Sequence, residues 1–124
     1  MAFSTLIKNM LMTPGQKKEE NDQYLKKMFP LGNKQQEWEN SIFEELFKDK
    51  NRIPTIKYVC YARREMYIDN IALQDDYLNN RDYKKLLKRM KISDNELRII
   101  EKLAKLENEA KDLSELPTIS DILA

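Results

Sequence analysis

Glycine occurs at only two of the 124 positions of this chain, Gly15 and Gly32. Strand-rich folds need glycine for their tight turns, and phosphate-binding loops need it where the backbone approaches the ligand. Over most of the chain, apolar residues recur three and four positions apart, which is the spacing of one helix face. We therefore expect an all-α fold, a small helical bundle of about five or six helices.

The length is that of one domain, since single domains cluster near 100 to 150 residues. We expect one helical domain over residues 1–117, in which 1–29 form a loosely packed N-terminal arm. Pro117 ends regular structure in this interpretation, and 118–124 form a C-terminal tail.

The first half of the chain contains three predicted helices. Apolar spacing predicts the first over 3–12, and Thr13 followed by Pro14 begins a second that runs to about Phe29. Asn33 and Gln36 resemble a capping box that opens a third helix to about Lys48. Its wide apolar face predicts a core helix; the face consists of Trp38, Ile42, Phe43, Leu46 and Phe47.

Pro54 begins a predicted long helix that runs to about Leu78. A helix of about 24 residues spans roughly 36 Å, so this element would be the central strut of the bundle. The run 58–61 is the alternative, a short strand, but no strand partner is evident. A short helix then ends near Lys91, and the capping box of Ser93 and Glu96 opens a last helix to about Asp112.

Histidine is absent from the sequence, which removes the commonest general base and the commonest metal ligand. Cys60 is a candidate nucleophile, but a reactive thiol needs a histidine or clustered positive charge to lower its pKa. Its nearest cations along the chain are Lys57, Arg63 and Arg64. Because free cysteine is among the most buried residue types, we expect Cys60 to be structural.

Paired carboxylates are a weaker signal for a metal site. Di-metal sites in helical bundles normally include Glu-x-x-His, which this chain lacks, and no calcium-loop spacing occurs. The pairs considered are Glu19 with Glu20, Glu44 with Glu45, Asp75 with Asp76, and Glu65 with Asp69. We expect no catalytic residue, no cofactor and no metal, and hence a protein that is not an enzyme.

The single cysteine and the short apolar runs predict the setting of the protein. One cysteine forms no internal disulfide, and no apolar run approaches the 18 residues of a membrane span. Lys8 and Asn9 interrupt the N-terminal apolar segment, which disfavours a signal peptide. We expect a cytoplasmic protein with no membrane association.

The near-neutral charge of +1 conceals a polarised chain. Residues 79–92 carry six cations against the single anion Asp82, whereas residues 93–124 carry a net charge of −4. The overall charge creates no field that would hold the chain on nucleic acid. The division predicts an internal electrostatic pairing, or an antiparallel self-association, between the two segments.

The basic helix and the capped helix after it also resemble, superficially, a helix-turn-helix. The candidate nucleic-acid contacts are Arg81, Lys84, Lys85, Lys88, Arg89, Lys91, Asn95 and Arg98. Asp94 and Glu96 at the tip would repel phosphate, and the turn lacks glycine. One alternative is that the basic helix is simply a solvated face whose positive charge offsets the negative charge of neighbouring segments. Another alternative is that it contacts an acidic partner protein.

Two apolar segments predict partner surfaces, one at each end of the chain. In the last long helix the apolar residues alternate steps of four and three, the seam of a helix pair. The candidate contacts are Phe3, Leu6, Ile7, Met10, Leu11, Ile99, Leu103, Leu106, Leu113, Ile119, Ile122 and Leu123. Alternatively, both segments close the domain's own core.

The main hypothesis is therefore a non-enzymatic helical protein-interaction module, an adaptor, assembly factor or small regulatory protein. Its partner is another protein or a second copy, with a homodimer along the seam from Ile99 to Leu113. The alternative hypothesis is a nucleic-acid-binding regulator that uses the basic helix.

Overall fold

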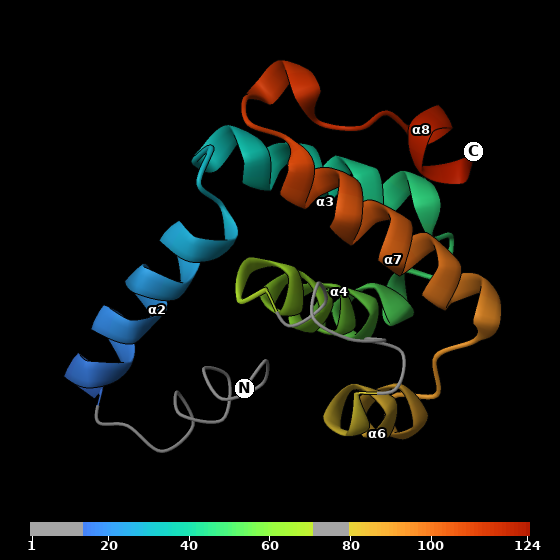
Figure 1. Cartoon of the computed structure of the whole chain (residues 1–124), viewed down its shortest axis with the longest axis horizontal. Helices are drawn as coiled ribbons and strands as arrows, with labels where there is room; N and C mark the ends of the chain where they lie inside the picture. The colour runs from blue at the N-terminus through green and yellow to red at the C-terminus, as the bar shows by residue number, and fades with distance from the viewer. Residues whose placement is uncertain (1–13, 71–79) are drawn as a thin grey trace.

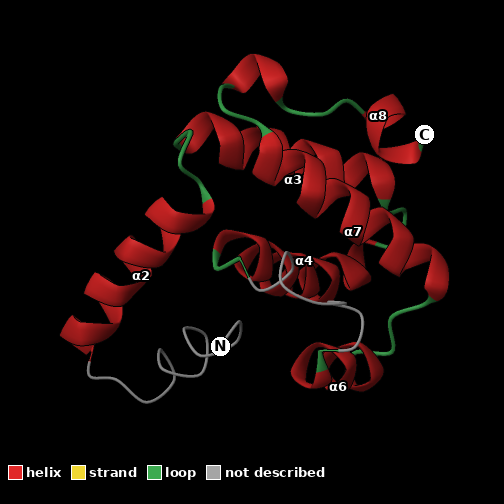
Figure 2. Ribbon diagram, viewed as in Figure 1, coloured by secondary structure: helices red, strands yellow, loops and turns green. Residues whose placement is uncertain are grey.

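The computed structural model describes residues 14–70 and 80–124. These residues form six α-helices and two short 3-10 helices, without a strand, as Figure 2 shows. The all-α prediction is confirmed, while the predicted helix over 3–12 lies outside the described residues. The elements are α2 (Pro14–Met28), α3 (Asn33–Leu46), η1 (Lys50–Arg52), α4 (Ile53–Ile68), α6 (Arg81–Arg89), α7 (Asp94–Glu109), η3 (Leu113–Glu115) and α8 (Ile119–Leu123).

Helix α4 is the centre of the bundle. It packs most extensively against α7 and also contacts α2, α3 and α6. In Figure 1, α3 and α7 lie above α4, α6 lies below it, and α2 extends away at the left. The short α8 lies against α7 and α3. The predicted central role of the helix led by Pro54 is thus confirmed.

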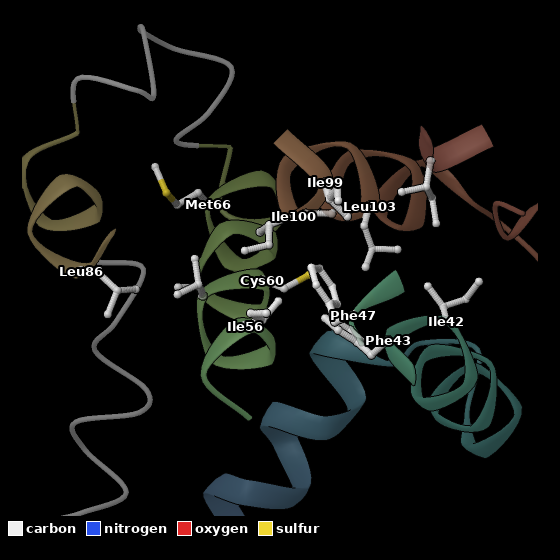
Figure 3. Close-up of a cluster of buried hydrophobic side chains, with 14 of the residues drawn as sticks. Ile42, Phe43, Phe47, Ile56, Cys60, Met66, Leu86, Ile99, Ile100 and Leu103 are labelled. Atoms are coloured by element: carbon white, nitrogen blue, oxygen red, sulfur yellow. The ribbon is translucent and has the colours of Figure 1, made fainter. Parts of the chain in front are cut away.

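One apolar core joins α3, α4, α6 and α7, and part of it is drawn in Figure 3. Phe43 and Phe47 stack with ring centroids 5.8 Å apart. Cys60 is fully buried in this core, as expected of a structural cysteine. The labelled core residues are Ile42, Phe43, Phe47, Ile56, Cys60, Met66, Leu86, Ile99, Ile100 and Leu103.

Helix α4 ends at Ile68, ten residues before the predicted end at Leu78. Asn70 has a φ of 62°, in the left-handed region that asparagine tolerates, and its N–H donates to the carbonyl of Tyr67 at 3.1 Å. A left-handed residue of this kind commonly ends a helix. The alternative of a strand over 58–61 is also wrong, because that run lies inside α4.

The start of α3 differs from the prediction as well. Its N-cap is Gly32, whose φ of 83° suits a residue without a Cβ, and no side chain caps the helix. The predicted capping box of Asn33 and Gln36 is therefore wrong. Instead the buried Gln35 accepts a hydrogen bond from the N–H of Leu31 through Oε1, at 3.1 Å. The helix also ends earlier than expected, at Leu46.

The capping box at the start of α7 is confirmed. Ser93 Oγ accepts from the N–H of Glu96 at 3.1 Å, and Glu96 Oε1 accepts from the N–H of Ser93 at 3.0 Å. A second box that sequence reasoning missed, formed by Thr118 and Asp121, opens α8. Each box joins residues three positions apart, so its hydrogen bonds lie within one turn of the helix. Helix α7 itself ends at Glu109, short of the predicted Asp112.

The segment 118–124 packs on the domain. Ile122 of α8 is 3% exposed and belongs to the main core. The preceding turn is held by Trp38, whose Nε1 donates to the carbonyl of Pro117 at 3.2 Å. This segment is therefore part of the bundle, which corrects the expectation of a separate tail.

Helix α2 joins the bundle through its C-terminal end. Tyr24, Met28 and Phe29 are buried, whereas residues 21–23 are exposed. The Phe29 ring meets the ring of Tyr61 edge to face, with centroids 5.9 Å apart. Only the last two turns of α2 thus contribute to the core among the side chains that the structure describes.

Candidate functional site

Helix α4 carries three consecutive charged residues, Arg63, Arg64 and Glu65, each at most 1% exposed. Sequence analysis did not recognise them as buried. The available signal was their position between Ala62 and Met66, in a helix whose apolar residues occupy every side. Buried charges are costly unless they are paired, so their partners define the interior of this protein.

Arg64 is the hub of the first buried cluster. Its Nη1 lies 3.5 Å from Oε2 of Glu107 on α7, and the same nitrogen donates to the carbonyl of Met28 at the end of α2. Gln35 of α3 donates to Glu107 Oε2 at 2.9 Å. The cluster thus ties four helices together with polar contacts.

Glu39 adds a second carboxyl group to this cluster. Tyr61 Oη donates to its Oε1 at 2.7 Å. Within the described residues, no group outside this carboxyl pair donates to the Oε2 of Glu39 or to the Oε1 of Glu107. Burial, followed by the charge of Glu107, raises the pKa of Glu39 to about 9. Because two carboxyl groups share the single guanidinium of Arg64, the fold favours the protonated form of Glu39.

Arg63 organises a separate cluster between α4, α6 and α7. Its Nε lies 3.9 Å from Glu101 Oε1, and its guanidinium lies 4.2 Å from the ring centroid of Tyr67. Tyr83 of α6 donates to the same Glu101 oxygen at 3.4 Å. Arg63 therefore links the basic helix to the centre of the bundle.

Glu65 has a different environment, between α4 and the end of α2. Among the residues that the structure describes, neither of its carboxylate oxygens has a hydrogen-bond partner, and the hydroxyl of Tyr24 also has none. Burial raises the pKa of Glu65 to about 7, although the charge of Lys27 opposes this shift. Lys27 itself pairs with Asp69 at 3.1 Å. Glu65 thus changes its charge near neutral pH.

Helix α6 separates its apolar and cationic sides as predicted. Tyr83 and Leu86 are buried against the core, and Asn80 caps the helix by accepting from the N–H of Tyr83 at 2.9 Å. All the cations of the segment are exposed. We name them the basic face: Arg81, Lys84, Lys85, Lys88, Arg89 and Lys91.

The predicted internal pairing of the basic face with the acidic C-terminal segment stays a prediction. Ion pairs in the described residues include Lys27–Asp69, Arg52–Glu96, Arg63–Glu101 and Arg64–Glu107. Their cations come from α2, η1 and α4. The side chains of the basic face are exposed along its whole length.

Arg52 clamps the turn that connects α6 to α7. It donates to the carbonyls of Met90 and Lys91 at 3.2 and 3.3 Å, and its Nη2 lies 2.9 Å from Glu96 Oε1. Lys91 has a φ of 54°, and the N–H of Ile92 reaches back to the carbonyl of Leu87 at 3.1 Å. These contacts form a Schellman motif with lysine where glycine is usual.

The same clamp changes the electrostatics at the tip of α7. Burial alone would raise the pKa of Glu96, but hydrogen bonds from Arg52 and Ser93 outweigh it, and the pKa is lowered. Glu96 is thus an anion neutralised by Arg52, while Asp94 remains exposed. Asn95 and Arg98, two predicted nucleic-acid contacts, bind each other at 3.1 Å.

The predicted partner residues divide between core and surface. Ile99, Leu103 and Ile122 are buried, Leu106 and Ile119 are partly buried, and Leu113 and Leu123 are 45% and 48% exposed. Ile99 and Leu103 of the seam therefore face the core of one chain, whereas Leu113 at its end is exposed. A homodimer along the seam stays a prediction. The N-terminal candidates, Phe3, Leu6, Ile7, Met10 and Leu11, lie outside the described residues.

Two surface hollows flank α7. The larger, about 490 Å³, has three carboxylates and one lysine above an apolar lining, and we name it the acidic hollow. Its residues are Lys102, Leu106, Glu109, Ala110, Glu115, Pro117, Asp121 and Ala124. The smaller, about 260 Å³, is flanked by Arg98, Lys102 and Lys105 and by Tyr67. Arg64, Glu39 and Glu107 line neither hollow.

One carboxylate pair considered in the sequence, Glu44 with Glu45, lies on α3. Glu44 and Glu45 are exposed on α3, and the described residues contain no group of three or more potential ligands placed to hold a metal. In the described ranges, none of the helices has the length and apolar character required to cross a bilayer.

The strongest chemical features are thus two buried ionic clusters, a basic face and an acidic hollow. No protein-family model, no curated protein and no solved structure matches the chain.

Proposed function

We propose that this chain is a non-enzymatic helical protein-interaction module that acts through the basic face of α6 on an acidic surface of a partner protein. The observation that carries the proposal is the anchoring of α6. Tyr83 and Leu86 are buried in the core while every cation of the segment is exposed. A charged face on a fixed helix is a surface on which a partner of opposite charge can dock.

The rigidity of α6 supports this role. Arg63 of α4 contacts Glu101 and the ring of Tyr83, which lies on the buried side of α6. Arg52 donates to the carbonyl of Met90 in the turn that follows α6. A partner that binds a preorganised helix loses less conformational entropy than one that must order it. Complementary charge also speeds the encounter and selects the partner.

The placement of the titratable groups supports a role without catalysis. Glu39, Arg64 and Glu107 are nearly fully buried, bind one another and neighbouring side chains, and line neither surface hollow. A catalytic acid or base must come within hydrogen-bond reach of its substrate. The single, fully buried Cys60 supports a reducing, cytoplasmic setting.

A second candidate function is nucleic-acid binding through α6 and the start of α7. The observation that favours it is the pairing of Glu96 with Arg52, which removes one of the two carboxylates that would repel phosphate. Exposed Asp94 at the tip opposes it. Binding to an acidic protein is favoured because it needs only the basic face, not the tip of α7.

The test is affinity capture from an extract of the cells that make the protein, with the intact chain and with Lys85→Glu/Lys88→Glu. The matched control is Lys26→Glu/Lys34→Glu, which reverses two exposed charges away from α6. Proteins that the intact chain and the control retain, that the α6 variant loses, and that nuclease does not release support the proposal. It is overturned if the α6 variant retains the same proteins.

A titration with duplex DNA at low salt separates the two candidates. Counterion release makes nucleic-acid binding strongest under these conditions. We expect no binding of the intact chain. Binding that weakens steeply with salt and is lost in Lys85→Glu/Lys88→Glu would replace the first candidate with the second.

A further inference from the structure

The acidic hollow is built on fixed elements. It lies where the end of α7, η3 and the start of α8 meet, and its apolar part is formed by Leu106, Ala110 and Pro117. Glu109, Glu115 and Asp121 contribute three carboxylates, against the single cation Lys102. The hollow therefore combines an apolar lining with excess negative charge.

Two of its carboxylates are held in place by hydrogen bonds. Asp121 Oδ2 accepts from the N–H of Thr118 at 2.9 Å, and Glu115 Oε1 accepts from the N–H of Lys111 at 2.9 Å. The bonds from Thr118 lower the pKa of Asp121, so this group remains an anion in neutral solution. Fixed carboxylates need little ordering when they bind a cation.

The chemistry of the hollow matches the side chain of lysine or arginine. Such a side chain lays its aliphatic stem on apolar surface and keeps its charged head near anions. A helix with cations at successive turns would bring one into the hollow and others to the surrounding carboxylates. Helix α6 presents such a face, the basic face.

The basic face does not reach the acidic hollow of its own molecule. Figure 1 shows α6 below α4, whereas the end of α7 and α8 lie on the opposite side. Complementary surfaces on opposite sides of one molecule are satisfied together only by another molecule.

We infer that the basic face of α6 docks at the acidic hollow of a second copy of this chain. This inference rests on the proposed function and names the partner as the protein itself. The two surfaces differ, so the contact between copies is heterologous. Successive copies form a closed ring if the rotation from one copy to the next allows it, and otherwise an open chain. The contact is distinct from the seam of α7, whose Ile99 and Leu103 are buried within one copy.

Salt dependence gives the first test, by sedimentation of the intact chain over a series of protein concentrations. Charges interact over about 30 Å at an ionic strength of 0.01 M but over about 3 Å at 1 M. We expect association at the low ionic strength and monomers at the high one. A monomer at every concentration in low salt overturns the inference.

Charge reversal gives the sharper test, with Lys85→Glu/Lys88→Glu for the basic face and Glu109→Lys/Glu115→Lys for the acidic hollow. Each variant alone should lose association by at least about tenfold, because like charges then meet. An equal mixture should associate again, since the reversed face of one variant complements the reversed hollow of the other. An unfolded variant would not give this rescue.

The control is Glu44→Lys/Glu45→Lys, which makes the same charge change on the exposed side of α3. It should associate at least as strongly as the intact chain. Undiminished association of Glu109→Lys/Glu115→Lys alone, or a mixture that stays monomeric, overturns the inference. If self-association fails while α6-dependent capture of another protein persists, only the identity of the partner is wrong; if both fail, the proposed function fails with it.

Discussion

Arg64 and Glu107 form an ion pair between α4 and α7, with Nη1 and Oε2 3.5 Å apart and with 2% and 0% of their side chains exposed. Desolvation makes a buried pair a poor source of net stability, but it makes the loss of one partner expensive. Because Arg64 also binds the carbonyl of Met28, the pair sets how α2, α4 and α7 meet.

Arg64→Met should destabilise the fold by about 3–5 kcal/mol, because it leaves the carboxylate of Glu107 buried without its cation. Urea unfolding of the whole chain measures this free energy. The double variant Arg64→Met/Glu107→Leu removes both charges and should recover much of the loss. A single variant within about 1 kcal/mol of the parent would contradict this role for the pair.

Stability should fall as the pH rises from about 5 towards 9. The pKa of Glu39 is about 9 in the fold and 4.5 as the ordinary value, and that of Glu65 is about 7. The folded state keeps protons that the unfolded chain releases, so their stabilising effect is complete below pH 4.5 and is lost as the pH rises through the folded pKa values. Chemical unfolding at a series of pH values measures this slope.

Glu39→Gln should flatten the alkaline part of that profile, because an amide imitates the protonated carboxyl group beside Tyr61 and Glu107. Its stability at pH 8 should exceed that of the parent. Glu45→Gln, at an exposed position of the same helix, is the matched control and should leave the profile unchanged. An unaltered slope in Glu39→Gln would show that Glu39 does not carry the effect.

Lys91→Gly should stabilise the fold by about 1 kcal/mol. Lys91 has a φ of 54°, where a Cβ is unfavourable and glycine is not. Lys91→Ala removes the same charge without relieving the backbone, so it should give no such gain. Thermal unfolding measures the stability of the two variants. Equal stability of Lys91→Gly and Lys91→Ala would show that any gain comes from removal of the lysine charge and not from the backbone.

Leu103→Ala should cost about 2–5 kcal/mol, because Leu103 is fully buried between α7 and its neighbours. Leu113→Ala, the same substitution at a residue that is 45% exposed, should change stability by less than about 0.5 kcal/mol. Unfolding experiments on the two variants test whether the seam belongs to the core. Similar small losses of stability at both positions would show that the seam is not part of the core.

Two local signals in the sequence agree with the structure, the capping box of α7 and the two sides of α6. The capping box of Ser93 and Glu96 forms because its donors and acceptors lie within one helical turn. The two sides of α6 follow from spacing alone, and burial of Tyr83 and Leu86 confirms them. The predicted helix boundaries at Gly32 and Asn70 are wrong. Both residues have a left-handed backbone conformation, which the pattern of apolar side chains does not predict.

The sequence by itself determined the all-α class, the position of α6 and its cationic face, and the burial of Cys60, because periodicity and composition act residue by residue. Only the tertiary structure decided which charges lie inside. Gln35 meets Glu107 across 72 positions, and Trp38 holds Pro117 across 79. Burial of Arg64 depends on such distant partners, since a charge enters the core only where other parts of the chain supply its counter-charge and hydrogen bonds.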